Sequence, residues 1–317
     1  MKNIHSGMYP TMITPYSKNG QIDPVATAEL VNFYWENGAN GIFACCMSSE
    51  IFRLSLEEKI ALAQITKETA DKLGKALPAR QQLAVVASGH TAESLDDQVY
   101  ELNKVADTGI DAIVLITNRM DIDNTGDDNW IRQTEQLIRQ LPSNLTIGVY
   151  ECPFPYYRGL TPRMIDWMKE TGRFSFIKDT CCNADLLNER LEQLKGSGIK
   201  LFNANTRTLL HSLRAGGDGY CGVMGNILPR LYAWLCENYQ TDAQKADNIQ
   251  EFLNFCARLE TMQYPCSAKY FLNRFGGVRM EHLSRNTDCQ LLTDDHKSFI
   301  SLLNVVAHDV YSYLSIS

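Results

Sequence analysis

The feature that most constrains this chain is a regular alternation of short apolar runs with longer amphipathic segments over residues 1–226. The apolar runs are MYPTMIT (8–14), GIFACC (41–46), LAVVAS (83–88), DAIVLIT (111–117), LTIGVY (145–150), FSFIKD (174–179), KLFNAN (200–205) and GYCGVM (219–224). They are rich in β-branched, aromatic and other apolar residues, which is typical of strands buried on both faces. Helical patterns separate them, at 25–38, 57–73, 92–108, 128–140, 162–171, 184–195 and 206–215. Eight strands with helices between them predict an α/β fold, a (β/α)8 TIM barrel.

A doubly wound sheet is the alternative, but no GxGxxG motif follows an early strand, and eight units favour a closed barrel. After residue 226 the strand pattern stops, and helical patterns follow at 227–238, 241–262, around 267–274 and at 294–314. No linker rich in Gly, Pro or Ser separates this part. We therefore predict a barrel over 1–226 and a C-terminal helical extension, 227–317, packed on it.

Three helix starts carry local signals. Asp23-Pro24 offers a cap and a first-turn proline, the segment from Ser55 to Glu58 reads as a capping box, and Thr161-Pro162 begins the fifth helix.

The composition excludes several classes of partner. A net charge of -7 argues against nucleic acid and anionic membrane surfaces, which require a basic face. The first residues lack the pattern of a signal peptide, and no apolar run approaches the roughly 20 residues that span a bilayer. We therefore expect a cytoplasmic protein whose ten cysteines are free thiols rather than a disulfide framework. Neither the vicinal cysteine pairs nor the six histidines have metal-site spacing, so we expect no metal.

The active site of such a barrel lies at the carboxyl ends of its strands, which makes the strand ends the first place to look for chemistry. Lys178 lies at the end of the sixth predicted strand, after an apolar stretch. An apolar surrounding favours the neutral amine, which can attack a ketone carbonyl and form a Schiff base. The same pattern is also typical of a strand-end lysine that reaches solvent.

The fifth predicted strand, LTIGVY, ends in Tyr150. Side chains alternate between the faces of a strand, and the leucine, isoleucine and valine of this run share the face opposite to Tyr150. Because the apolar face suits the helix layer, we expect Tyr150 to point into the barrel, one strand from Lys178. A tyrosine beside a lysine can transfer a proton during imine formation and carbon–carbon cleavage. A buried aromatic ring with a satisfied hydroxyl is the structural alternative.

The second predicted strand runs into CMSSE, where Ser48, Ser49 and backbone amides near a helix start can hold a carboxylate. Serines in this position are also common helix caps.

Taken together, these strand ends resemble those of the dihydrodipicolinate synthase / N-acetylneuraminate lyase family of class I aldolases. The resemblance covers nearly the whole chain and rests on motifs in the right order and spacing. They are GMYPTMITPY (7–16), GANGIFACCMSSE (38–50), YECP (150–153), FIKDT (176–180) and AGGDGYCGVMGNILP (215–229).

Position by position, the resemblance implies that Lys178 forms the imine and that Tyr150 transfers protons. It places Ser48 and Ser49 on the loop that binds the 2-keto carboxylate, and Cys221 where a backbone carbonyl lines the pyruvate site. It also implies a homo-oligomer, a tetramer or a dimer, with pyruvate and an aldehyde as small-molecule partners and no metal or organic cofactor.

Departures from the family pattern concern the substrate pocket. Met47 stands where the synthase has a hydroxyl of its proton relay, and Pro155 stands where it has a substrate-binding arginine. TNRM (117–120) replaces the synthase's tyrosine pair after the fourth strand. The acidic pair with which the sialic-acid lyase binds sugar hydroxyls corresponds to Thr206 and Arg207. The departures disfavour both lysine biosynthesis and sialic-acid cleavage.

The resemblance places Asn205, Thr206 and Arg207 on the rim where the family contacts the distal part of its substrate. A guanidinium suits a carboxylate or phosphate, so we expect aldehydes with an acidic or strongly polar tail. An arginine in the first turn of a helix also commonly points to solvent.

The leading hypothesis is a pyruvate-dependent aldolase or lyase that cleaves or forms a 2-keto-3-deoxy sugar acid or a related 2-keto acid. A 2-keto-acid dehydratase shares the imine and is the nearest alternative. The altered loop at 46–49 motivates a third hypothesis, a non-catalytic regulator that binds 2-keto acids.

Overall fold

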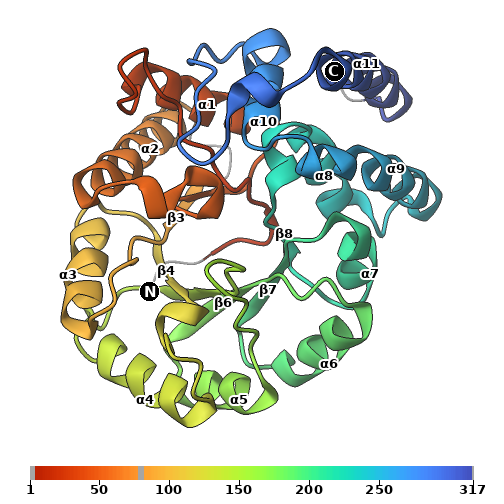
Figure 1. Ribbon diagram of the computed structural model, residues 1–317. Coiled ribbons are helices and arrows are strands. Elements are labelled where there is room, and N and C mark those ends of the chain that lie inside the picture. Colours follow the sequence, from red (N-terminus) through yellow and green to blue (C-terminus); the bar gives the residue numbers. More distant parts are fainter. Residues whose placement is uncertain (1–3, 78–81, 316–317) are drawn as a thin grey trace.

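Eight parallel strands surrounded by helices form the body of the molecule (Figure 1). The computed structural model describes residues 4–77 and 82–315. The strands are β1 (Gly7–Met8), β2 (Gly41–Ala44), β3 (Ala84–Ala87), β4 (Ala112–Ile116), β5 (Ile147–Tyr150), β6 (Phe174–Asp179), β7 (Lys200–Asn203) and β8 (Gly219–Tyr220). The helices of the ring are α1 (Pro24–Glu36), α2 (Leu56–Ala76), α3 (Leu95–Ala106), α4 (Asp127–Ile138), α5 (Pro162–Thr171), α6 (Ala184–Leu194), α7 (Leu209–Arg214) and α8 (Pro229–Asn238). The order β1-β8-β7-β6-β5-β4-β3-β2 confirms the predicted (β/α)8 barrel and excludes a doubly wound sheet, in which β1 is central.

The barrel closes between β1 and β2 without a regular ladder. An isolated bridge joins Thr11 to Phe43. The Met12 N–H donates to the Phe43 carbonyl at 2.9 Å, and the Phe43 N–H donates to the Pro10 carbonyl at 3.0 Å. Pro10 has no N–H to contribute, so the run expected as a strand over 8–14 is regular only at its start.

The three predicted helix starts are confirmed. Asp23 accepts hydrogen bonds from the first N–H groups of α1, and Ser55 and Glu58 form a capping box at α2. Thr161 caps α5, whose first residue is Pro162.

Aromatic side chains fill the barrel interior. Tyr9 and Phe202 lie with ring centroids 4.9 Å apart, and Phe176 lies 6.1 Å from Phe202. Gly148 leaves room for the ring of Phe176, because a Cβ there would lie 2.1 Å from that ring. Gly148 precedes Tyr150 on the same face of β5, and it is a glycine because the Phe176 ring occupies the space that a side chain would need.

The remaining helices lie outside the ring, beside α1 and α8 (Figure 1). They are α9 (Ala243–Cys256), α10 (Cys266–Phe271) and α11 (Asp294–Tyr313). They match the helical patterns read from the sequence at 241–262, around 267–274 and at 294–314, and the pattern at 227–238 corresponds to α8 of the ring. The division into 1–226 and 227–317 stays a prediction.

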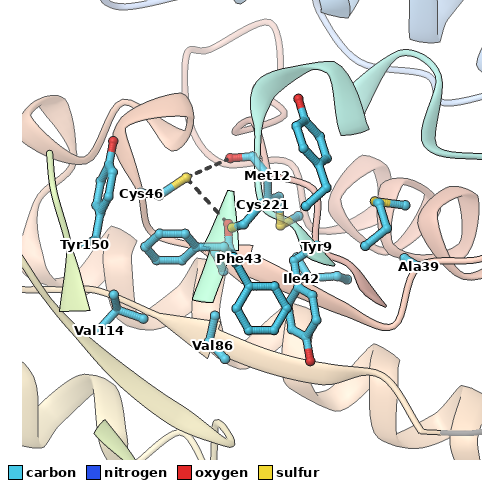
Figure 2. Close-up of a cluster of buried hydrophobic side chains, with 14 of the residues drawn as sticks. Tyr9, Met12, Ala39, Ile42, Phe43, Cys46, Val86, Val114, Tyr150 and Cys221 are labelled. Atoms are coloured by element: carbon cyan, nitrogen blue, oxygen red, sulfur yellow. Dashed lines mark hydrogen bonds between the residues drawn. The ribbon is translucent and has the colours of Figure 1, made fainter. Parts of the chain in front are cut away.

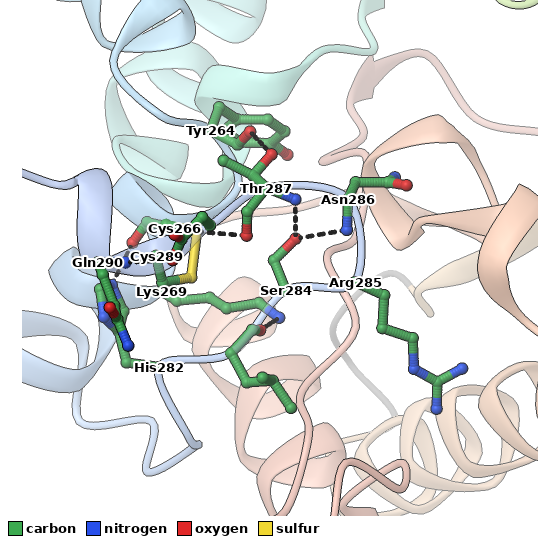
Figure 3. The surroundings of a disulfide bond; sticks show 12 residues. Tyr264, Cys266, Lys269, His282, Ser284, Arg285, Asn286, Thr287, Cys289 and Gln290 are labelled. Atoms are coloured by element: carbon green, nitrogen blue, oxygen red, sulfur yellow. Dashed lines mark hydrogen bonds between the residues drawn. A yellow bond between two sulfur atoms is a disulfide. The ribbon is translucent and has the colours of Figure 1, made fainter.

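The prediction that all ten cysteines are free thiols is wrong for two of them. Cys266, at the start of α10, is disulfide-bonded to Cys289 (Figure 3). Their Cα atoms lie 5.2 Å apart although 23 positions separate them in the sequence. The segment between the two cysteines returns to α10 through irregular backbone, so no local sequence pattern predicts that they pair. Eight cysteines are free.

No helix in the part of the chain that the structure describes is long and apolar enough to cross a membrane.

Candidate active site

Neighbouring strands bring Tyr150 and Lys178 together at the carboxyl end of the barrel. The two residues are in register across the β5–β6 ladder, so their side chains share one face. The Lys178 Nζ lies 3.9 Å from the centroid of the Tyr150 ring. Both side chains are buried, with exposed fractions of 5% and 3%. The expectation that Tyr150 lies beside Lys178 agrees with this geometry, and the lysine does not reach solvent.

Phe43 forms the wall opposite this pair. Its ring centroid lies 5.6 Å from that of Tyr150 in an edge-to-face contact, and 5.2 Å from the Lys178 Nζ. Figure 2 shows Tyr150, Phe43 and Cys46 gathered in the same part of the barrel. Phe43 could not be recognised from the sequence as a site residue, because it lies within an apolar run and has no local mark of such a role.

Burial keeps the phenol of Tyr150 protonated. It raises the pKa of Tyr150 well above its usual value, and a hydrogen bond with the Cys152 thiol acts in the same direction. The side chain whose ring contacts the Lys178 amine therefore keeps an O–H donor, which can pass a proton to a group bound at Lys178.

Two thiols near the lysine are held in the neutral form. Burial raises the pKa of Cys221 to about 12 and also raises the pKa of Cys152. The charge of Lys178 opposes the shift at both thiols. Because a thiol is a poor nucleophile without ionisation, these cysteines do not compete with Lys178 for a carbonyl.

The two serines of the loop after β2 have different surroundings. The Ser49 hydroxyl donates to the Met12 carbonyl at 2.6 Å and accepts from the Cys46 N–H at 3.1 Å. Its bonding capacity is used within the protein. The Ser48 hydroxyl contacts only other hydroxyls in the described part of the chain: it donates to Thr11 at 2.9 Å and hydrogen-bonds with Tyr264. Hydroxyl partners can exchange donor and acceptor roles, so the Ser48 hydroxyl can turn its proton to a ligand, whereas backbone groups hold the Ser49 hydroxyl.

Left-handed backbone flanks this loop at two residues that are not glycine. Cys45 has a φ of 48° and Glu50 a φ of 61°. Such conformations cost of order 1 kcal/mol each and persist where surrounding contacts enforce them.

Contacts from the C-terminal extension hold Glu50, at the end of this loop. Glu50 Oε2 accepts hydrogen bonds from the Ser284 hydroxyl and the N–H groups of Arg285 and Asn286, at 2.5–3.0 Å. Lys269 forms a buried ion pair with Glu50 at 3.6 Å. Figure 3 shows Lys269 and the segment 284–287 lying beside the disulfide. We call this set the Glu50 cradle, and it ties the serine loop to α10.

A buried ionic cluster holds the ends of β5 and β6. Arg190 of α6 pairs with Glu151 at 2.7 Å and with Asp179. Glu151 also accepts from the N–H groups of Leu160 and Thr180 at 2.7 and 2.9 Å. Glu151 follows Tyr150 and Asp179 follows Lys178, so the cluster fixes the strand ends on which the two candidate residues lie.

The three rim residues after β7 are brought to one place but point in different directions. Asn205 caps the 3-10 turn η4 (Thr206–Thr208), and its Nδ2 donates to the Cys182 Sγ at 3.1 Å. The Thr206 hydroxyl is buried and lies 2.8 Å from the Tyr232 hydroxyl. Arg207 is exposed at the rim.

Comparison with known proteins assigns the family. The sequence model of the Dihydrodipicolinate synthetase family matches residues 5–288. The chain belongs to this family. It is therefore an enzyme of the lyase class. A 4-hydroxy-tetrahydrodipicolinate synthase of Methanocaldococcus jannaschii is 28% identical over 250 residues, which cover 78% of this chain and 80% of that protein.

Solved structures share the fold. A sialic acid aldolase of Ruminococcus gnavus has a TM-score of 0.84 at 17% identity and covers 98% of this chain and 99% of its own. A prophage protein of the dihydrodipicolinic acid synthase family from E. coli K12, solved with pyruvate, has a TM-score of 0.83 at 20% identity, covering 96% and 98%. At these identities the likeness supports the barrel and its extension, and it does not assign a substrate.

Proposed function

We propose that this chain is a pyruvate-dependent class I aldolase in which Lys178 forms a Schiff base with the 2-keto acid and Tyr150 transfers the protons. The observation that carries the proposal is the pair itself: a buried amine 3.9 Å from the ring of a buried tyrosine, on adjacent strands, in a member of this family. The complex of the E. coli relative with pyruvate supports the choice of keto acid.

The chemistry follows from the positions of the two groups. The neutral Lys178 amine adds to the C2 carbonyl of pyruvate and forms a carbinolamine. Proton transfer from Tyr150 lets the hydroxyl leave as water, which gives the imine. Loss of a proton from C3 gives an enamine, and its C3 attacks the aldehyde carbon. Hydrolysis releases the product and regenerates the amine, and cleavage runs through the same steps in reverse.

The carboxylate of the keto acid needs donors near Lys178. We assign this role to Ser48 and the backbone N–H groups of its loop, since the Ser49 hydroxyl is engaged inside the protein. The Cys221 backbone lines the same region in the proposal, and its thiol responds to the charge of Lys178. A homo-oligomeric state and a cytoplasmic location stay predictions.

The test is covalent trapping. Pyruvate with borohydride should add one reduced pyruvyl group to Lys178, located by peptide mass mapping, and Lys178→Ala should remove it. Modification at another lysine, or none at saturating pyruvate, would contradict the proposal. Trapping without turnover on any aldehyde would favour the regulator, and loss of water from a 2-keto-3-deoxy acid without carbon–carbon cleavage would favour the dehydratase.

A further inference from the structure

A polar pocket of about 850 Å³ opens at the carboxyl end of β7. It lies between η4, α9 and the 3-10 turn η6 (Ala257–Thr261). It is close to the end of β6, because Asn205 at its edge contacts Cys182 and the Ala204 N–H donates to the Asp179 carbonyl at 2.9 Å. The pocket therefore belongs to the same end of the barrel as Lys178.

Glu260 on η6 carries a carboxylate oxygen in this pocket that has no hydrogen-bond partner among the described residues. This oxygen, Oε1, is buried. A hydrogen bond from Thr206 and the charge of Arg207 favour the ionised carboxylate, but burial outweighs them. A buried carboxylate oxygen without a donor costs free energy that a ligand donor can recover. Burial raises the pKa of Glu260 to about 7, so the carboxylate and the acid are both present near neutral pH.

The charges around the pocket restrict what can fill it. Arg207 and Arg258 contribute two positive charges, and Glu251 and Glu260 contribute two negative ones. When Glu260 is ionised the lining is formally neutral, so a charged tail gains little from it, and an acidic tail would meet the Glu260 carboxylate. A chain of hydroxyl groups fits better, since each hydroxyl donates to a carboxylate and accepts from a guanidinium.

We infer that Glu260 is a specificity-determining residue that accepts a hydrogen bond from a hydroxyl on the distal part of the aldehyde, while Arg207 donates to the same tail. The substrate class is then the neutral polyhydroxylated aldehydes. This inference rests on the proposed function. It replaces the acidic tail expected from Arg207 alone and keeps the strongly polar one.

The kinetic experiment compares two aldehydes of equal length, D-arabinose and pentanal, each with pyruvate. Glu260→Leu should lower kcat/KM for D-arabinose by about 10- to 100-fold, the effect of losing a hydrogen bond to a charged group. For pentanal it should change kcat/KM by less than about 3-fold. Each effect is a ratio of variant to wild type, so ring closure of the sugar cancels. Glu189→Leu removes an exposed glutamate of α6 and should change neither ratio.

The pH profile separates an accepting carboxylate from a merely structural side chain. In the wild type, the preference for D-arabinose over pentanal should rise as the pH increases through about 7, because the ionised Glu260 is the stronger acceptor. Glu260→Gln should keep part of the preference and remove its pH dependence. An equal loss on both aldehydes, or an unchanged preference in Glu260→Leu, would overturn the inference.

Two further measurements distinguish a failure of this inference from a failure of the proposed function. Pyruvate trapping at Lys178 should persist in Glu260→Leu. If trapping fails in the wild type, the proposed imine is contradicted, but ligand binding in the pocket can still be tested directly. That test is ligand-observed NMR with mannitol, with 1,6-hexanediol as the matched control. Wild type should bind mannitol in preference to the diol and Glu260→Leu should not. Equal binding of mannitol by both proteins would overturn the inference whatever the outcome of trapping.

Discussion

Tyr150 combines a packing contact with a chemical group, and the two can be separated. Its ring packs against Phe43 and lies under the Lys178 amine, while its hydroxyl reaches Cys152. Tyr150→Phe keeps the ring, so we expect little change in the free energy of unfolding and a fall in turnover of about two to four orders of magnitude. Steady-state kinetics beside urea unfolding checks both. Wild-type turnover in Tyr150→Phe would show that the role of Tyr150 is purely structural.

The two loop serines should respond differently to the same change. Ser48→Ala should weaken pyruvate binding by about 1–3 kcal/mol, the cost of losing a hydrogen bond to a charged group. Ser49→Ala removes the donor to the Met12 carbonyl and the acceptor of the Cys46 N–H, so it should lower the free energy of unfolding by about 1–3 kcal/mol. Calorimetric titration with pyruvate and urea unfolding, applied to both variants, distinguish the roles. If pyruvate affinity is unchanged in Ser48→Ala, backbone N–H groups alone hold the anion.

At the scale of elements, a neutral histidine joins β3 to β4. His90 follows β3, and its Nε2 accepts a hydrogen bond from the Ile116 N–H at 2.7 Å. The ring proton is therefore on Nδ1, which donates to the Gln98 Oε1 at 2.9 Å. Burial lowers the pKa of His90 to about 4 from the usual 6.5. Between these values the unfolded chain binds the extra proton and the folded chain does not.

The stability carried by this histidine is present above about pH 6.5 and is lost as the pH falls towards 4. A shift of this size corresponds to a loss of about 3 kcal/mol. His90→Gln has no proton to gain in that range, so its free energy of unfolding should fall less on acidification. Urea unfolding at pH 7 and pH 4.5 measures the difference. The same acid-induced loss in variant and wild type would show that other groups dominate.

At the scale of the molecule, the Glu50 cradle connects the C-terminal extension to the mouth of the barrel, and the disulfide cross-links the extension next to that cradle. Cross-linking positions 23 apart stabilises a chain by about 3 kcal/mol through the entropy of the unfolded state. Cys289→Ser should therefore lower the free energy of unfolding by about that amount. It should also weaken pyruvate binding, because the segment that holds Glu50 lies next to the bond (Figure 3). Cys182→Ser, at an exposed free thiol, is the control.

Lost stability with unchanged pyruvate affinity would show that the cradle holds the serine loop without the bond. An unchanged free energy of unfolding, measured under oxidising conditions, would show that the cross-link does not constrain the unfolded chain.

The sequence by itself determined the order of the elements, the starts of three helices and the proximity of Tyr150 to Lys178. These properties depend on local patterns: apolar runs, capping residues, and the alternation of side chains along strands that are neighbours in the barrel. The role of Phe43 was missed although its strand was predicted, because that role depends on its contact with the Tyr150 ring on another strand of the barrel.

Tertiary structure alone decided the features made by distant segments. The Cys266–Cys289 bond, the contact of Ser284 with Glu50 and the unpartnered oxygen of Glu260 all depend on how the C-terminal extension folds and packs on the barrel. Ser284 and Glu50 are 234 positions apart, and neither residue has neighbours in the sequence that mark the contact. Periodicity and capping record how a segment folds on itself. They carry no information on which distant side chain completes a hydrogen bond, and at this barrel's mouth those bonds hold the loop of Ser48.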